Sequence, residues 1–157
     1  ESEYEIVNRY LQLNDINKQK LLKAANELYF SQLYKYRVHA KLSAGLGNYY
    51  DENYEFDTVY FSSEYDYDIA SWVDGDSMEP KYHNGDVALI KKTGFDYDGL
   101  IYAVVYNEET YIKKAYIEED KVRLVSLNDK YDDIIAPIDE VRIVGLVTKS
   151  FRPISEV

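Results

Sequence analysis

The stretch 73–90 places one serine on a sharp turn between two apolar runs. Gly75 permits a tight turn after the first run, Ser77 follows on the bend, and Gly85-Asp86 precedes the second run. A serine in such a turn exposes its hydroxyl and leaves neighbouring backbone N–H groups free to bind an oxyanion. Gly-Asp-Ser is also common in plain polar turns, so the serine is a nucleophile only if the chain supplies a base.

The base for this serine must come from a short list of side chains. The chain has no Cys, and its two His, His39 and His83, stand in no pattern that indicates a Ser-His-Asp triad. A lysine can take the role when burial disfavours its charged form. The strand-like run 110–116 holds Lys113 and Lys114, which point to opposite faces of a period-2 strand. An ordinary solvated lysine on a hairpin is the plain alternative.

The two segments together resemble a known family, the LexA and phage-repressor group of Ser–Lys autoproteases, which also includes the polymerase accessory protein UmuD. The resemblance runs over about residues 38–152 and includes the 36-residue interval from Ser77 to Lys113. The residues that carry it are Gly75-Asp76-Ser77-Met78-Glu79-Pro80, then Gly85-Asp86, then Tyr111-Ile112-Lys113-Lys114.

This resemblance implies a role for each motif residue. Ser77 would be the nucleophile, and Lys113, the first lysine of the pair, would be its base, with Lys114 as a neighbour. The backbone N–H groups of Asp76 and Ser77 would form the oxyanion hole. The chain lacks Cys and its two His lie far apart in sequence, so we expect no metal and no cofactor.

The resemblance also implies that the substrate lies in the same chain, as a small–Gly peptide bond before the serine. Ala44-Gly45 lies 33 residues before Ser77 and fits that position. Both residues are small enough to bend into a narrow cleft, and Gly45 tolerates positive φ. Joining substrate to catalyst gives a high effective concentration, so a modest nucleophile suffices.

Two kinds of hydrophobic pattern divide the chain. Residues 3–33 have helical spacing, with Asn14 or Asp15 as the N-cap of a second helix. From Tyr36 onward, short alternating runs are separated by turn residues, with hairpin turns at Asn107-Glu108 and 118–120. This pattern predicts a mostly β fold, a LexA-like antiparallel domain after a short two-helix segment. The predicted strands are 57–62, 68–73, 86–92, 100–106, 109–117, 121–127 and 141–149.

We therefore predict three regions along the chain. Residues 1–35 would be a helical remnant or linker after a helix-turn-helix DNA-binding domain, which we expect to be missing because the chain starts at Glu1 rather than Met. Residues 36–56 would hold the cleavage site, and 57–157 the protease-like dimerisation domain. In the late strand 141–149, alternation would place Val141, Ile143, Gly145 and Val147 on one face and Val144 and Leu146 on the other.

The charge of the chain is strongly uneven. The net charge is −11, with +2 in residues 1–43 and −13 in the rest. An acidic body repels phosphate, so the main domain should bind neither DNA nor an anionic membrane. With no 18-residue apolar run and no signal segment, the sequence predicts a soluble cytoplasmic protein.

The function that best fits these features is the self-cleaving regulatory domain of a LexA-type repressor. By resemblance, the protein would form a homodimer through its C-terminal strands and would bind operator DNA through the missing N-terminal domain. A RecA–single-stranded-DNA filament or an analogous signal would induce cleavage. Two alternatives remain: a UmuD-like polymerase accessory protein activated by self-cleavage, and a signal-peptidase-like Ser–Lys enzyme that acts in trans.

Overall fold

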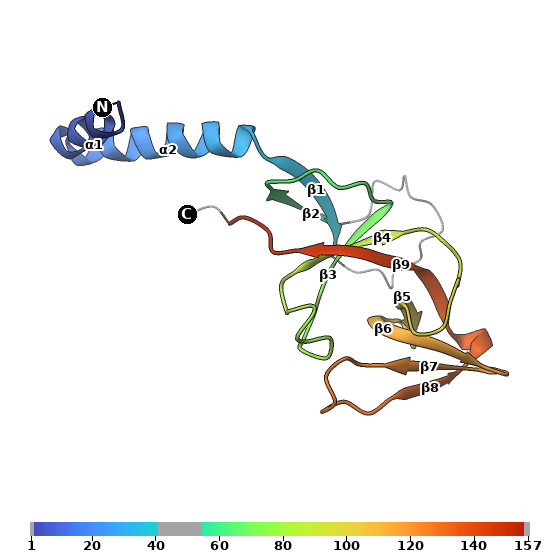
Figure 1. Ribbon diagram of the computed structural model, residues 1–157. Helices are drawn as coiled ribbons and strands as arrows, with labels where there is room; N and C mark the ends of the chain where they lie inside the picture. Colours follow the sequence, from blue (N-terminus) through green and yellow to red (C-terminus); the bar gives the residue numbers. More distant parts are fainter. Residues whose placement is uncertain (1, 41–54, 156–157) are drawn as a thin grey trace.

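A nine-stranded sheet with two helices before it makes up the fold in the computed structural model, which describes residues 2–40 and 55–155 (Figure 1). The strand order is β2-β1-β3-β4-β9-β5-β6-β7-β8, and every named pair is antiparallel except the short parallel pair β1–β3. The predicted mostly β fold is confirmed. The elements are α1 (Ser2–Gln12), α2 (Asp15–Ser31), β1 (Tyr34–His39), β2 (Phe56–Phe61), β3 (Ile69–Trp72), β4 (Val87–Lys91), β5 (Ile101–Tyr106), β6 (Glu109–Glu118), β7 (Lys121–Val125), β8 (Ile134–Pro137), the 3-10 turn Ile138–Glu140 and β9 (Arg142–Phe151).

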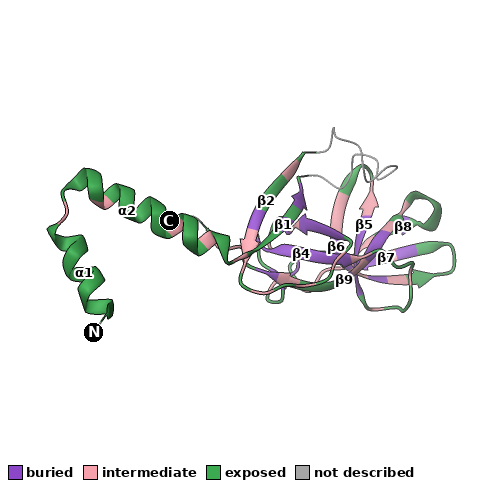
Figure 2. Cartoon of the chain, turned by 90° about the horizontal axis from the view of Figure 1, so that it is seen from above, coloured by how far each residue is buried: buried purple, intermediate pink, exposed green. Residues whose placement is uncertain are grey.

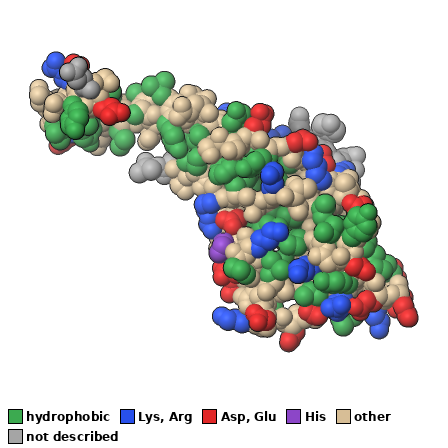
Figure 3. All heavy atoms as spheres, viewed as in Figure 1, with side chains coloured by type: hydrophobic (Ala, Val, Ile, Leu, Met, Phe, Trp, Pro, Cys, Tyr) green, Lys and Arg blue, Asp and Glu red, His purple; other side chains and the backbone are tan. Residues whose placement is uncertain are grey.

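The two helices extend away from the β domain (Figures 1 and 2). Asn14 caps α2 by accepting a 2.9 Å hydrogen bond from the backbone N–H of Asn17, as its side-chain type predicts. Neither helix has a buried residue, and large apolar side chains such as Ile6 and Leu28 are exposed on them. Figure 3 shows hydrophobic side chains at the surface of the helices, and acidic and basic side chains interspersed over the β domain. No described helix is long and apolar enough to cross a membrane.

Tight hairpins connect the strands that carry the site. Asn107 and Glu108 both have positive φ (50° and 63°) and join β5 to β6, and Glu119 (φ 56°) lies in the turn from β6 to β7. Both turns were predicted from their polar residues. Two-residue connections of this kind match the right-handed twist of the strands, and they fix the register of β6 against β5 and β7.

The predicted alternation of β9 is wrong. Val144 and Val147 pack in one core cluster, whereas Ile143 and Leu146 pack in another. The ladder with β5 skips Val144, and the ladder with β4 skips a residue before Lys149. Each extra residue is a bulge that reverses the period-2 pattern, and the sequence gives no direct sign of it. Strand β8 was also missed, because it is short, follows acidic turn residues and ends at Pro137.

The bulged part of β9 lies close to β4. A Cβ atom built on Gly145 would clash with the carbonyl oxygen of Lys91 and would lie 2.8 Å from Cγ2 of Ile90. Backbone atoms in the middle of a sheet cannot move aside without loss of the ladder. Only glycine fits this position.

We therefore expect Gly145→Ala to lower the free energy of unfolding by about 3 kcal/mol, the upper end of the usual overpacking penalty. The matched control is Gly94→Ala, because a Cβ atom at Gly94 meets nothing within 4 Å and its φ is not in the left-handed region. Thermal and urea unfolding would measure both. Equal midpoints for the two variants would contradict the close packing of β9 on β4.

Candidate active site

The loop between β3 and β4 presents Ser77. At its base, Val73 N–H donates to the carbonyl of Asp86 (2.8 Å), and Gly85 N–H donates back to the carbonyl of Val73 (2.9 Å). Gly75 adopts φ 77°, and its N–H donates to Oδ1 of Asn84 at 2.9 Å. The turn predicted around the serine is therefore closed by its own backbone.

The residues that follow the serine anchor this loop in the core. Met78 and Tyr82 are buried, and they pack in the cluster that includes Ile69 and Ile90 from β3 and β4. Ser77 itself is half-buried. The loop thus holds its hydroxyl at the surface of a cleft, on a support that cannot move far.

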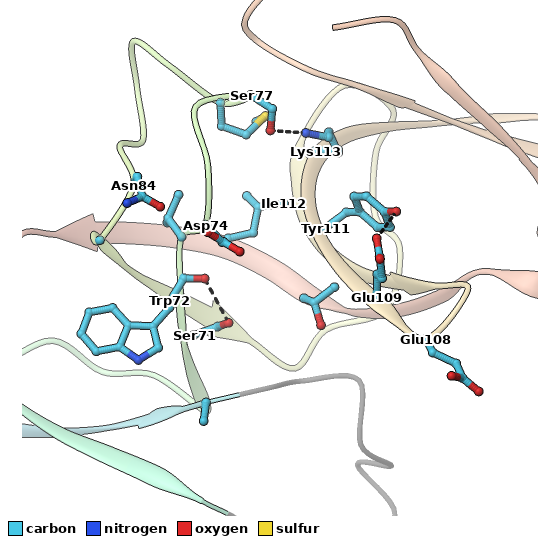
Figure 4. Close-up of a pocket in the computed structure, with 15 residues that line it drawn as sticks. Ser71, Trp72, Asp74, Ser77, Asn84, Glu108, Glu109, Tyr111, Ile112 and Lys113 are labelled. Atoms are coloured by element: carbon cyan, nitrogen blue, oxygen red, sulfur yellow. Dashed lines mark hydrogen bonds between the residues drawn. The ribbon is translucent and has the colours of Figure 1, made fainter.

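Lys113 reaches the serine from β6. Its side chain is buried, with 6% of the residue exposed, and its Nζ donates a hydrogen bond to Oγ of Ser77 (Figure 4). Burial lowers the pKa of Lys113 from the usual lysine value, because the interior disfavours the ammonium form. Lys114, the alternative lysine, is only half-buried and lies next to Val125 of β7 in the ladder.

The surroundings of Lys113 contain little that would stabilise its ammonium form. Within residues 2–40 and 55–155, no carboxylate forms an ion pair with it. The ring of Tyr131 lies 5.9 Å from Nζ and is the one described aromatic group over it. The carboxylate of Asp76, the nearest acid in sequence to the serine, accepts a hydrogen bond from the Tyr131 hydroxyl instead. A neutral amine is therefore accessible, and a neutral amine is what a general base requires.

A cleft of about 670 Å³ lies beside the two side chains (Figure 4). It extends from the end of β1, at Ala40, past β3 and the serine loop to the first half of β6. Its lining residues are Ala40, Ser71, Trp72, Val73, Asp74, Ser77, Met78, Asn84, Gly85, Glu108, Glu109, Thr110, Tyr111, Ile112 and Lys113. A cleft of this size accommodates a short extended peptide.

The loop between β7 and β8 contacts the serine loop, and sequence reasoning missed it. Asn128 N–H donates to the carbonyl of Ser77 at 3.0 Å, and Nδ2 of Asn128 donates to the carbonyl of Asp76 at 3.1 Å. These residues lie about 50 positions from the serine and form no motif with it. A polar run between two apolar strands was the one available signal, and every surface loop has one.

The structure brings together some of the predicted site residues and not others. Ser77 and Lys113 are in contact, with Asp76 beside them. Ala44 and Gly45 lie outside the described residues. Neither histidine lines the cleft: the His39 ring packs 4.5 Å from the Phe56 ring, and His83 Nδ1 lies 3.7 Å from the Asp86 carboxylate. Among the described residues, no group of three or more His, Asp or Glu could hold a metal ion.

Comparison with known proteins gives one family. The sequence matches the Peptidase S24-like family over residues 32–148. The LexA repressor of Thermosipho melanesiensis is 32% identical over 120 residues, which cover 73% of this chain and 60% of that protein. The LexA repressor of Xanthomonas citri is 33% identical over 119 residues, which cover 74% of this chain and 55% of that protein. The chain thus spans little more than half the length of these relatives.

Burial of Lys113 should reduce the stability of the fold at neutral pH. We expect Lys113→Met to raise the free energy of unfolding by about 1 kcal/mol at pH 7, because methionine fills similar space without a charge to desolvate. The lowered pKa means that the unfolded chain binds this proton more readily, so wild-type stability rises with pH up to the ordinary value of 10.5. The gain from Lys113→Met should therefore shrink as the pH approaches that value.

Urea unfolding at several pH values would measure this effect, with Lys114→Met as the matched control at the half-buried neighbour. A Lys113→Met protein that is less stable than wild type at pH 7, with a difference that does not change with pH, would contradict a desolvated lysine.

Proposed function

The chain belongs to the Peptidase S24-like family, and we propose that it is the self-cleaving regulatory part of a LexA-type repressor, with Ser77 as nucleophile, Lys113 as base and Ala44–Gly45 as the bond cut. The hydrogen bond between Lys113 Nζ and Ser77 Oγ, beside an open cleft, is the observation that carries this proposal. Cleavage would separate the domain described here from whatever lies before the cut.

The chemistry follows from the two side chains. Neutral Lys113 accepts the proton of Ser77 as Oγ attacks the carbonyl carbon of Ala44. The resulting oxyanion binds the N–H groups of Ser77 and Asp76, and the ammonium of Lys113 gives its proton to the leaving amine of Gly45. Water then hydrolyses the ester on Ser77, with Lys113 again as the base. The products are a carboxylate at Ala44 and an amine at Gly45.

The position of β1 supports a reaction within one chain. Ala40 lines the same cleft as Ser77 and Lys113, and its N–H donates to the carbonyl of Glu55 at 3.2 Å. The two residues that flank the segment 41–54 are therefore hydrogen-bonded to each other, and the first of them lies at the cleft. Ala44 is four residues beyond Ala40, and four extended residues span at most about 14 Å. The short spacing between Ala40 and Ala44 therefore supports cleavage by the serine of the same chain.

The other parts of the proposal concern the whole repressor. We propose that the protein forms a homodimer, binds operator DNA through an N-terminal domain, and is induced by a RecA–single-stranded-DNA filament or an analogous signal. One feature of the structure supports the dimer. Among the described residues, the end of β9 (147–151) pairs with β4 on one side only, so its other edge is open to pair with a second copy of the chain. A dimer that contacts two operator half-sites at once binds far more tightly than two separate DNA-binding domains. Cleavage would therefore weaken operator binding.

We expect the purified protein to cut itself slowly into fragments of 44 and 113 residues. Ser77→Ala and Lys113→Ala should each lower the rate by at least about 1000-fold, because each removes one half of the catalytic pair. Lys114→Ala should stay within about threefold of wild type, since Lys114 does not reach the serine. Gel analysis and intact mass would identify the fragments. A Ser77→Ala protein that cleaves at the wild-type rate would disprove the assignment.

The rate should rise with pH. Protonated Lys113 cannot accept a proton, so the rate is low below its pKa and reaches a plateau above it, with a midpoint below the usual 10.5 because burial lowers that pKa. The rate constant should not depend on protein concentration, because the reaction is intramolecular. Rates that increase in proportion to concentration would instead support the peptidase that acts in trans.

A further inference from the structure

Two hydrogen bonds from Asn128 hold the backbone on both sides of the Ser77 nitrogen. Asn128 Nδ2 donates to the carbonyl oxygen of Asp76 at 3.1 Å, and Asn128 N–H donates to the carbonyl oxygen of Ser77 at 3.0 Å. These contacts join the β7–β8 loop to the β3–β4 loop across 52 residues of sequence. They do not touch the side chain of the serine or of Lys113.

The first of these bonds fixes the direction of the Ser77 N–H. The carbonyl of Asp76 and the N–H of Ser77 belong to one planar peptide unit, in which the C=O and N–H point in opposite directions. Rotation of this unit would move both groups together. The Asp76 oxygen accepts from two donors, Nδ2 of Asn128 and, within the serine loop, the N–H of Glu79 at 3.1 Å. Donors that hold this oxygen on one side hold the Ser77 N–H on the other, where the proposed oxyanion would lie.

Asn128 is itself held in the orientation that this contact needs. Its Oδ1 accepts a hydrogen bond from the N–H of Lys130 at 3.1 Å, which leaves Nδ2 as the group that faces Asp76. Its carbonyl accepts from the N–H of Tyr131 at 3.2 Å, and the Tyr131 hydroxyl donates to the Asp76 carboxylate. The backbone and the side chain of Asn128 are thus all hydrogen-bonded, and the loop contacts both the carbonyl and the carboxylate of Asp76.

We propose that Asn128 is the positioning residue of the oxyanion hole: its amide holds the Asp76–Ser77 peptide unit so that the Ser77 N–H points at the reacting carbonyl. This inference rests on the proposed function, in which Ser77 is the nucleophile. Asn128 touches neither the reacting atoms nor the base, so its loss should lower the plateau rate and leave the pH midpoint of Lys113 in place.

The expected loss of rate follows from the group that Asn128 orients, the N–H of Ser77. Loss of an oxyanion-hole donor costs about 100- to 1000-fold in rate. The Ser77 N–H would remain after substitution, and the Asp76 carbonyl would keep the hydrogen bond from Glu79 N–H but lose its second donor. We therefore expect a reduction of about 10- to 100-fold in the plateau rate of self-cleavage.

Two variants isolate the amide donor. Asn128→Ala removes it without a change of charge. The double variant Asn128→Asp with Asp129→Asn keeps the acceptor for Lys130 N–H and the net charge, and it replaces the Nδ2 donor with a carboxylate oxygen that repels the Asp76 carbonyl. Asp129→Asn alone is the matched control, because Asp129 is exposed in the same loop. Each would be measured as a pH–rate profile well below its melting temperature, so that reduced stability alone does not alter the rate.

A second readout does not depend on the cleavage segment. An alkyl fluorophosphonate reacts with the serine when Oγ attacks phosphorus, fluoride leaves and Lys113 takes the proton, while the phosphoryl oxygen occupies the oxyanion hole. Intact mass would give the labelling rate of Ser77. Both Asn128 variants should label at least about 10-fold more slowly than wild type and Asp129→Asn, in line with cleavage.

The outcomes separate this inference from the proposed function. If wild type cleaves, Ser77→Ala does not, and both Asn128 variants cleave and label at the wild-type rate, the inference is wrong and the proposed function stands. If Ser77→Ala also cleaves, the proposed function is wrong, and the role of Asn128 falls with it. A shifted pH midpoint in Asn128→Ala, with an unchanged plateau, would assign Asn128 to Lys113 instead and would also overturn the inference.

Discussion

The site depends on one constraint: a buried lysine amine lies next to a serine hydroxyl, and no described carboxylate pairs with that amine. Water would stabilise the ammonium form, and an acidic partner would stabilise it further. Burial leaves little of Lys113 in contact with solvent, and no carboxylate in the described parts of the chain pairs with it. Lys113 lies on a strand with β5 on one side along its first half and β7 on the other along its second half. Burial of this position favours the neutral amine, which is the form that can take up a proton.

Three separate parts of the chain build this arrangement, and each is held differently. The serine loop is closed by backbone hydrogen bonds at its base and anchored by Met78 and Tyr82 in the core. The lysine is fixed by the register of β6, which two tight hairpins determine. The β7–β8 loop contributes Asn128, whose amide donates a hydrogen bond to the backbone of the serine loop. Rigid support on all sides is what a catalytic pair needs, because misplacement by a fraction of an ångström reduces the rate.

The sequence predicted those features that local chemistry determines. Ser77 stands out because a glycine turn surrounds it, and the faces of the 110–116 run follow from the two-residue period of a strand. The faces of β9 were mispredicted, because the bulge at Val144 reverses the alternation and depends on the pairing with β5 rather than on the residues of β9. Asn128 could not be found at all, since its partners are main-chain carbonyls, which any residue possesses. Tertiary contacts to the backbone leave no residue-type signature.

The central claim is that Lys113 is a desolvated lysine whose amine is neutral within the range in which the protein is folded. Nuclear magnetic resonance of lysine labelled with carbon-13 at Cε, assigned by comparison with Lys113→Met, measures its titration directly. The account predicts a midpoint below the ordinary value of 10.5, because burial lowers the pKa of Lys113. A Lys113 resonance that titrates at 10.5 or above, together with the other lysines of the chain, would contradict it.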